Sequence, residues 1–157
     1  TGPVLVEIEA LVAPSTLASP RRNVVGWDGG RLAMLTAVLE ARCGVPLSGR
    51  DIFLNVAGGL KISETGADLA VAAALISSVS GRPTPPRTVF FGEVALSAEL
   101  RQVAQADARL KEAAKLGFDM AVMPKPRKKL DAPSGLSIAQ PSTLAELIEI
   151  MGGVSWS

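Results

Sequence analysis

The residues best suited to chemistry lie in one stretch, GGLKISETGADLAVAAAL, at residues 58–75. A serine can act as a nucleophile when burial lowers the pKa of a nearby lysine, because the neutral amine then accepts the serine proton. Ser63 would be that nucleophile, with Lys61 or Lys111 as the base. Lys61 and Ser63 are two residues apart, a spacing of about 6–7 Å on a strand, so the chain would have to turn before they could form a hydrogen bond.

A capping role is the alternative, and the favoured, interpretation of the same side chains. Oxygen atoms of serine, threonine and acidic residues accept hydrogen bonds from the backbone N–H groups that have no partner in the first turn of a helix. We expect Ser63, Glu64 and Thr65 to cap the apolar helix that follows, and Asp68 to complement its dipole. A phosphate-binding loop does not fit the spacing, because Lys61 is followed by isoleucine and not by serine or threonine.

Two clusters of basic residues have the composition of a phosphate-binding surface. One is the pair at residues 21–22 and the other is the stretch KPRKK, and together they contain Arg21, Arg22, Lys125, Arg127, Lys128 and Lys129. The chain has 16 basic and 15 acidic residues, so any affinity for DNA must come from such clusters and not from the net charge of +1. A solvated charge run is the default interpretation of both clusters, and contact with a phosphate backbone is the alternative that stays open.

The residue types that the chain lacks exclude several classes of site. It contains no histidine, which excludes Ser-His-Asp and Cys-His catalysis. Its one cysteine, Cys43, cannot form an intrachain disulfide or a thiolate zinc site by itself, and we expect a buried structural thiol at the end of an apolar helix. There is no tyrosine and only 4% of the residues are aromatic, so a base-stacking surface is poorly supplied.

Hydrophobic periodicity predicts the elements that position these side chains. We expect strands at residues 4–12, 23–27, 51–58, 88–96, 120–124 and 136–139. We expect helices, with Asp28 and Ser142 as the N-caps of the first and last and Gly117 ending the third, at residues 30–41, 67–79, 107–117 and 142–153. This alternation of strands and helices predicts one mixed α/β domain over residues 1–157.

The composition, with 48% apolar and 20% charged residues, is that of a folded globular chain. No run of about 18 apolar residues could span a membrane and no signal-peptide pattern opens the chain, so we expect a cytoplasmic protein without a membrane partner. The chain begins with Thr-Gly-Pro and not with methionine, from which we expect a piece of a longer protein.

Several blocks of the sequence resemble one known family. They occur in a constant order between about residues 3 and 151, and they read LVEIEALV, PRRNVVGWDGGRLAMLTAVLE, DIFLNVAGGLKISETGADLAVAAALISS, VFFGEVALSAELRQV and RLKEAAKLGFDMAVMPK. These blocks resemble the C-terminal domain of the RadA (Sms) family of bacterial DNA repair and recombination proteins. That domain is similar to the proteolytic domain of Lon proteases, so the resemblance implies a mixed α/β (α+β) fold of the Lon-like, ribosomal protein S5 domain 2-like type.

The resemblance to Lon also implies that the protease chemistry is absent. When the apolar helix of Lon is matched onto ETGADLAVAAALIS, Gly66 falls where Lon proteases have their nucleophilic serine, and Ser63 lies three residues too early. The Lon lysine falls near Asp107, and Lys111 stands one turn further on. Neither member of the Ser-Lys dyad is in place, so the resemblance assigns no catalytic residue to this chain.

What the resemblance implies instead is a non-proteolytic scaffold domain of a DNA-dependent, helicase-like ATPase. In the RadA family this domain follows a zinc-finger module and a RecA-like ATPase, and the whole protein drives branch migration of recombination intermediates as a hexameric ring. ATP, Mg²⁺ and Zn²⁺ would bind in those other parts, so we expect no cofactor and no metal in this chain. The implied partners are single-stranded or branched duplex DNA, further copies of the same protein and a recombinase of the RecA type.

Within this interpretation the two basic clusters are the expected DNA contacts, namely Arg21, Arg22, Lys125, Arg127, Lys128 and Lys129. Arg31 and Lys61 are further candidates, and Arg31 fits a subunit interface equally well. Two alternatives stay open. One is a Ser-Lys peptidase that uses Ser63 with Lys61 or Lys111, and the other is a ring-forming scaffold whose basic loops face away from DNA.

Overall fold

The computed structural model describes residues 7–58 and 64–153 of the chain. Its first sheet has three strands, in the order β1 (Glu7–Pro14), β3 (Arg50–Ala57) and β2 (Arg22–Val25). The central strand β3 pairs antiparallel with β1 and parallel with β2. Alternate residues of β3 point to opposite faces of the sheet, so Ile52, Leu54 and Val56 are buried while Asn55 is exposed.

The helices of the described ranges are α1 (Gly29–Cys43), α2 (Asp68–Ser80), α3 (Ala106–Lys115) and α4 (Leu144–Ile150). Asp28 caps α1 as predicted, because its Oδ2 accepts the N–H of Arg31 at 2.9 Å. Gly44 ends α1 in the left-handed conformation, which favours glycine. A short 3₁₀ helix, η1 (Thr65–Ala67), leads directly into α2.

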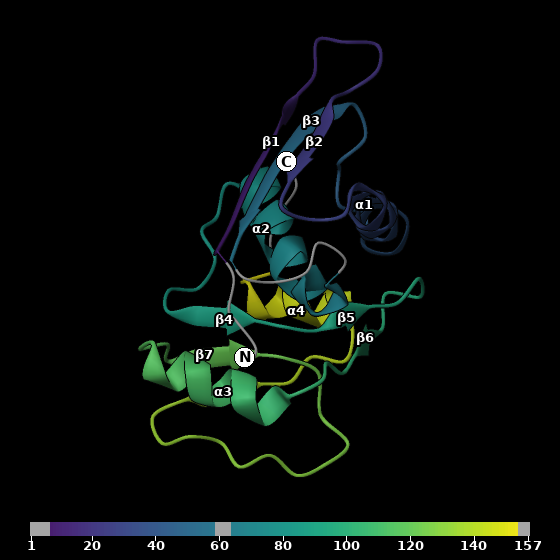
Figure 1. The fold of residues 1–157 in the computed structure, drawn as a ribbon. Coiled ribbons are helices and arrows are strands. Elements are labelled where there is room, and N and C mark those ends of the chain that lie inside the picture. The colour runs from purple at the N-terminus through teal and green to yellow at the C-terminus, as the bar shows by residue number, and fades with distance from the viewer. Residues whose placement is uncertain (1–6, 59–63, 154–157) are drawn as a thin grey trace.

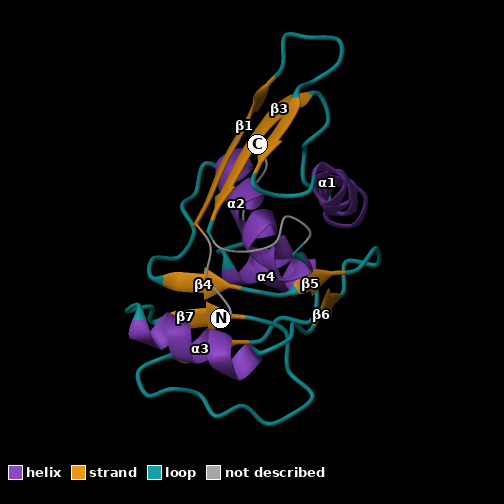
Figure 2. Cartoon of the chain, in the orientation of Figure 1, coloured by secondary structure: helices purple, strands orange, loops and turns teal. Residues whose placement is uncertain are grey.

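The second sheet consists of three short parallel strands, in the order β4 (Thr88–Phe90), β7 (Met120–Val122) and β8 (Ser137–Ala139). An antiparallel pair adjoins it, formed by β5 (Glu93–Val94) and β6 (Leu100–Arg101). In the orientation of Figures 1 and 2 the first sheet stands above the second, with α3 on the lower one.

The strand expected at residues 88–96 is divided into β4 and β5, so that prediction is wrong. The break falls at Gly92, whose N–H donates to the Gly66 carbonyl at 3.0 Å and whose carbonyl accepts the N–H of Leu69 at 3.1 Å. These bonds attach the chain to the start of α2 and not to a neighbouring strand. A side chain would not fit at this junction, because a Cβ on Gly92 would lie 2.9 Å from Cδ of Pro124.

Helix α4 begins at Leu144, one residue later than it would if Ser142 were its N-cap as predicted. Thr143 is the N-cap, and its hydroxyl accepts the N–H of Glu146 at 3.2 Å. The Glu146 carboxylate in turn accepts the N–H of Ser142 at 2.9 Å. Thr143 and Glu146 have the three-residue spacing of a capping box, although the Glu146 carboxylate binds the N–H of the residue before the cap and not that of Thr143. Thr143, and not Ser142, is therefore the N-cap.

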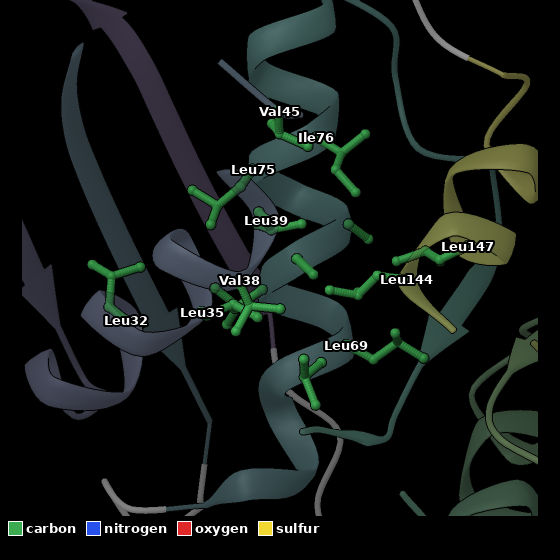
Figure 3. Close-up of a cluster of buried hydrophobic side chains, with 14 of the residues drawn as sticks. Leu32, Leu35, Val38, Leu39, Val45, Leu69, Leu75, Ile76, Leu144 and Leu147 are labelled. Atoms are coloured by element: carbon green, nitrogen blue, oxygen red, sulfur yellow. The ribbon is translucent and has the colours of Figure 1, made fainter. Parts of the chain in front are cut away.

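Helix α2 lies at the centre of the main hydrophobic cluster, between α1 and α4 in the view of Figure 3. The side chains shown there are buried, and those labelled are Leu32, Leu35, Val38, Leu39, Val45, Leu69, Leu75, Ile76, Leu144 and Leu147. A second cluster joins α3 to the second sheet through Leu110, Ala113, Ala121 and Met123. Because α2 contacts β1 of the first sheet and β4 of the second, it connects the two layers.

The predicted mixed α/β fold is confirmed, and the alanine-rich helix at its centre is enclosed as expected. Of the helices that the structure describes, none is long and apolar enough to cross a membrane.

Candidate functional site

The two basic clusters lie at opposite ends of the molecule (Figure 1). Arg21 and Arg22 are found where the loop from β1 enters β2, at the top of the view. Residues 125–129 belong to the long loop after β7, at the bottom. The structure therefore does not bring the two predicted DNA-contact clusters together into one patch.

Arg21 is held by an ion pair with Asp51, the second residue of β3. Its Nη2 lies 2.9 Å from Oδ2 of Asp51, and its backbone N–H donates to Oδ1 at 2.6 Å. Its guanidinium also lies over the Phe53 ring, with Cζ 5.5 Å from the ring centroid. The backbone and side-chain hydrogen bonds from Arg21 lower the pKa of Asp51 below its ordinary value. The Arg21 side chain is still 56% exposed, so it can face a phosphate while it keeps this pair.

The basic side chains of the loop at residues 125–129 are less engaged in contacts within the molecule than Arg21 is. Its basic side chains are exposed, and within the described ranges no ion pair involves Lys125, Arg127, Lys128 or Lys129. Gln102 anchors the start of the loop by donating from Nε2 to the Lys125 carbonyl at 3.0 Å. Arg22 is exposed too, but its Nη2 donates to the Leu47 carbonyl at 3.1 Å.

Arg31 is a poor candidate for a phosphate ligand, because its charge is used inside the molecule. Its Nε donates to Oδ1 of Asp68 at 2.7 Å, and its Nη2 donates to Oδ2. Asp68 is fully buried at the start of α2 and also accepts the N–H of Val94 at 2.9 Å. Burial raises the pKa of Asp68 above its ordinary value, while the hydrogen bonds from Arg31 and Val94 oppose that shift.

The Arg31–Asp68 pair corrects the interpretation of Asp68 as a simple complement to the helix dipole. Asp68 does stand in the first turn of α2, but its partner is a guanidinium from α1. A signal was present in the sequence, since Asp68 is the one charged residue in the apolar run at 67–79. A buried carboxylate requires a partner. The sequence pattern does not identify which residue that partner is.

A side chain at the position matched to the Lon serine would displace the Glu64 carboxylate. Gly66 is buried in η1, and a Cβ on it would lie 2.5 Å from Oε1 of Glu64 and 3.2 Å from Cγ1 of Val103. The Glu64 carboxylate accepts the N–H of Gly66 at 2.9 Å, so Glu64 caps η1 and not α2 as predicted; the N-cap of α2 is Ala67, which has no side-chain cap. A carboxylate of the chain itself thus lies where a serine side chain would begin.

Arg109 contacts the Glu64 carboxylate beside Gly66, and no role was predicted for it from the sequence. Its Nη2 lies 3.5 Å from Oε1 of Glu64, its Nε donates to the Ala104 carbonyl at 3.1 Å, and its side chain is only 12% exposed. A signal was available, because Arg109 stands three residues after Ala106 and four before Ala113. Both alanines pack into the second cluster, and residues at these spacings share one face of a helix.

A cavity of about 160 Å³ opens beside Gly66, between α2 and β4. Alanines of α2 line one side, the residues of β4 line another, and Arg109 contributes a charge. Of the predicted peptidase residues, Ser63 and Lys61 lie outside the described residues. Lys111 is exposed on α3, and so is Asp107.

The cysteine and the acidic residues form no metal centre in the described part of the chain, where no group of three or more histidine, cysteine, aspartate or glutamate side chains could hold an ion. Cys43 packs half-buried against the main cluster at the end of α1, and burial raises the pKa of its thiol. Both observations agree with a structural thiol.

Comparison with known proteins gives consistent matches. A family profile described as subunit ChlI of Mg-chelatase matches residues 33–127. The DNA repair protein RadA of Brucella abortus is 55% identical over 148 residues, which are 94% of this chain and 32% of that protein. The RadA protein of Pseudomonas aeruginosa is 46% identical over 149 residues, which are 95% of this chain and 33% of that protein. The chain therefore spans about a third of the length of these relatives.

Proposed function

The chain belongs to the protein family described as subunit ChlI of Mg-chelatase, and we propose that within it the chain serves as a non-proteolytic scaffold domain of a RadA-type DNA repair ATPase. The observation that carries this proposal is the similarity to DNA repair proteins named RadA, which extends over 94% of the chain for one relative and 95% for another. The buried Gly66, with the Glu64 carboxylate beside it, supports the non-proteolytic part of the proposal.

The DNA contact of this scaffold would be made mainly by the loop at residues 125–129. Its exposed lysines and arginine can approach phosphates without first giving up an ion pair with a described residue. Arg21 and Arg22 remain proposed contacts, but they would have to bind phosphate while they hold Asp51 and the Leu47 carbonyl.

A salt titration of DNA binding tests these assignments. Three matched double variants each remove two charges: Lys128→Gln with Lys129→Gln, Arg21→Gln with Arg22→Gln, and, as a control on α3, Lys111→Gln with Lys115→Gln. Each phosphate contact contributes about 0.9 to the slope of log affinity against log salt on duplex DNA, so a double variant in a true contact should flatten the slope by about 2. The control should leave the slope unchanged.

If both cluster variants kept the wild-type affinity and slope, the DNA assignment would be wrong, and a ring-forming scaffold without DNA contact would be the better interpretation. The binding should be measured with single-stranded and with branched duplex DNA, because the proposal includes both.

We further propose that the full-length protein assembles as a hexameric ring, uses ATP and Mg²⁺ to drive branch migration, holds Zn²⁺ outside this chain and cooperates with a RecA-type recombinase. These features come from the family resemblance, and the long similarity to RadA proteins supports them. Mass measurement of the full-length protein by sedimentation should give six copies. A full-length protein that stays monomeric at all concentrations would contradict the ring.

A further inference from the structure

Strand β4 is an edge strand of the second sheet, and one side of it has no strand beside it among the described residues. Its other side pairs with β7, through the Arg87 carbonyl and the Phe91 N–H. Successive residues of a strand direct their N–H and C=O groups to alternate sides. Thr88 and Phe90 therefore direct theirs toward the open edge, where a further strand can pair with them.

The open edge of β4 lies next to Gly92, whose backbone is already paired with another part of the chain. Gly92 is the next outward-facing position after Phe90, and it already exchanges two backbone hydrogen bonds with Gly66 and Leu69. No described segment continues that pairing from Gly92 back to Phe90 and Thr88. The cavity of about 160 Å³ opens along these residues. An extended segment laid here would continue the pairing with the two residues that are left.

The floor of the cavity selects for small side chains. It is formed by one face of α2, with Ala67, Ala70 and Ala74, and by the residues of β4. A cavity of about 150 Å³ can hold a molecule of the size of benzene, so this one has room for one or two small apolar side chains of a bound segment.

Arg109 gives the cavity a charge at the end near Gly66. Its contact with Glu64 is 3.5 Å long, whereas charge-assisted hydrogen bonds to carboxylates are about 2.7–2.9 Å. Glu64 also accepts the N–H of Gly66, so it does not bind the guanidinium alone. Because Arg109 also lines the cavity, its guanidinium is the group there that would attract a carboxylate of a bound segment.

We propose that this groove binds an extended peptide segment, which pairs with the Thr88–Phe90 edge, places small apolar side chains over the alanines of α2 and presents a carboxylate to Arg109. Addition of a strand to an exposed sheet edge is a general mode of peptide recognition, in which main-chain hydrogen bonds supply affinity and pockets for alternate side chains supply specificity. The segment is held and not cut, since Gly66 provides no nucleophile beside it.

A fluorescein-labelled hexapeptide, Val-Ala-Val-Ala-Val-Asp, tests the proposal by fluorescence anisotropy with the 157-residue chain. We expect binding with a dissociation constant below about 1 mM, and slower hydrogen exchange at the amides of Thr88 and Phe90. The same peptide with alternate amides N-methylated should not bind, because it cannot pair with the edge. Ala70→Leu should fill the groove and abolish binding, while the matched control Ala108→Leu, on the exposed face of α3, should not.

The role of Arg109 is tested by changing both partners. Replacing the terminal aspartate of the peptide with asparagine should weaken binding to the wild-type chain about tenfold but leave binding to Arg109→Gln unchanged, because the charge pair is already lost there. The proposal is overturned if the hexapeptide does not bind, if the N-methylated peptide binds equally well, or if Ala70→Leu has no effect. It is also overturned if a DNA oligonucleotide, and not the peptide, protects the Thr88 and Phe90 amides.

Discussion

Two carboxylates that the sequence predicted to cap or complement helix α2, Glu64 and Asp68, instead meet arginines from other helices. Glu64 lies against the N–H of Gly66 and near Arg109, and Asp68 neutralises Arg31 inside the molecule. Both acids hold distant elements together, because each meets an arginine from another helix. Among the described residues the stretch thus acts as a junction of the fold.

Replacing Asp68 with alanine should destabilise the chain by about 3 kcal/mol, because a mostly buried guanidinium loses its partner. The free energy of unfolding can be measured by urea denaturation, provided that the slope of the transition is unchanged. Asp107→Ala removes an exposed acid from α3 and serves as a control, with an expected effect below about 0.5 kcal/mol. A cost below about 1 kcal/mol for Asp68→Ala would contradict the importance of the pair.

Gly66→Ala should cost about 1–3 kcal/mol, because the new Cβ displaces the Glu64 carboxylate from its hydrogen bond. In the double variant with Glu64→Ala the obstructing atom is absent. The combined cost should then fall short of the sum of the single costs by more than about 0.5 kcal/mol. Additive costs in urea denaturation would argue that the two residues do not interfere. Gly66→Ser should show no peptidase activity.

The Arg21–Asp51 pair should make the chain less stable in acid. The folded state holds the pKa of Asp51 below its ordinary value, so the unfolded chain binds the proton more readily. The stabilisation is present above about pH 4 and is lost as the pH falls toward the lower folded pKa. Asp51→Asn should flatten this part of the curve of unfolding free energy against pH. Equal slopes for the variant and the wild type would exclude the pair as a source.

At the scale of elements, the boundaries that periodicity misplaced are those set by hydrogen bonds to other parts of the chain. The run at residues 88–96 has the composition of a strand, but Gly92 bonds to the turn before α2 and divides it. Helices α1 and α2 and strand β3 were predicted within a few residues, because their caps and apolar patterns are local. Local patterns identify an element, whereas its partners decide where it stops.

The cap of α4 can be tested directly. Thr143→Ala should destabilise the chain by about 1 kcal/mol, because the N–H of Glu146 loses its acceptor. Ser142→Ala should cost less than about 0.5 kcal/mol, since only the backbone of Ser142 joins the cap. Thermal or urea denaturation of the two variants would distinguish them, and a larger cost at Ser142 would restore the original prediction.

At the scale of the whole molecule, α2 connects two hydrophobic clusters that lie on different sheets. The single domain predicted from the alternation of strands and helices requires that both clusters unfold together. The same architecture separates the two basic clusters, since one belongs to the first sheet and the other follows a strand of the second.

Leu110→Ala, a change in the second cluster, should lower the midpoint of the unfolding transition that is measured by a probe in the first cluster. Leu110 is buried in the second cluster, and its truncation should cost about 2–5 kcal/mol. Trp27 is buried in the first cluster, so its fluorescence reports on that part alone once Trp156 is replaced by phenylalanine. An unchanged Trp27 transition would mean that the two layers unfold independently and would contradict the single domain.

The mixed α/β class, the principal helices and strands and the resemblance to RadA proteins could be predicted from the sequence, and the comparisons confirm that resemblance over most of the chain. Periodicity, caps and motif order are local properties, so a linear chain displays them. Which charges pair with one another is known only from the three-dimensional fold. Arg31 meets Asp68 across 37 residues and Arg109 meets Glu64 across 45. Such pairs depend on how distant elements approach, and that approach distinguishes a buried arginine from one exposed to solvent.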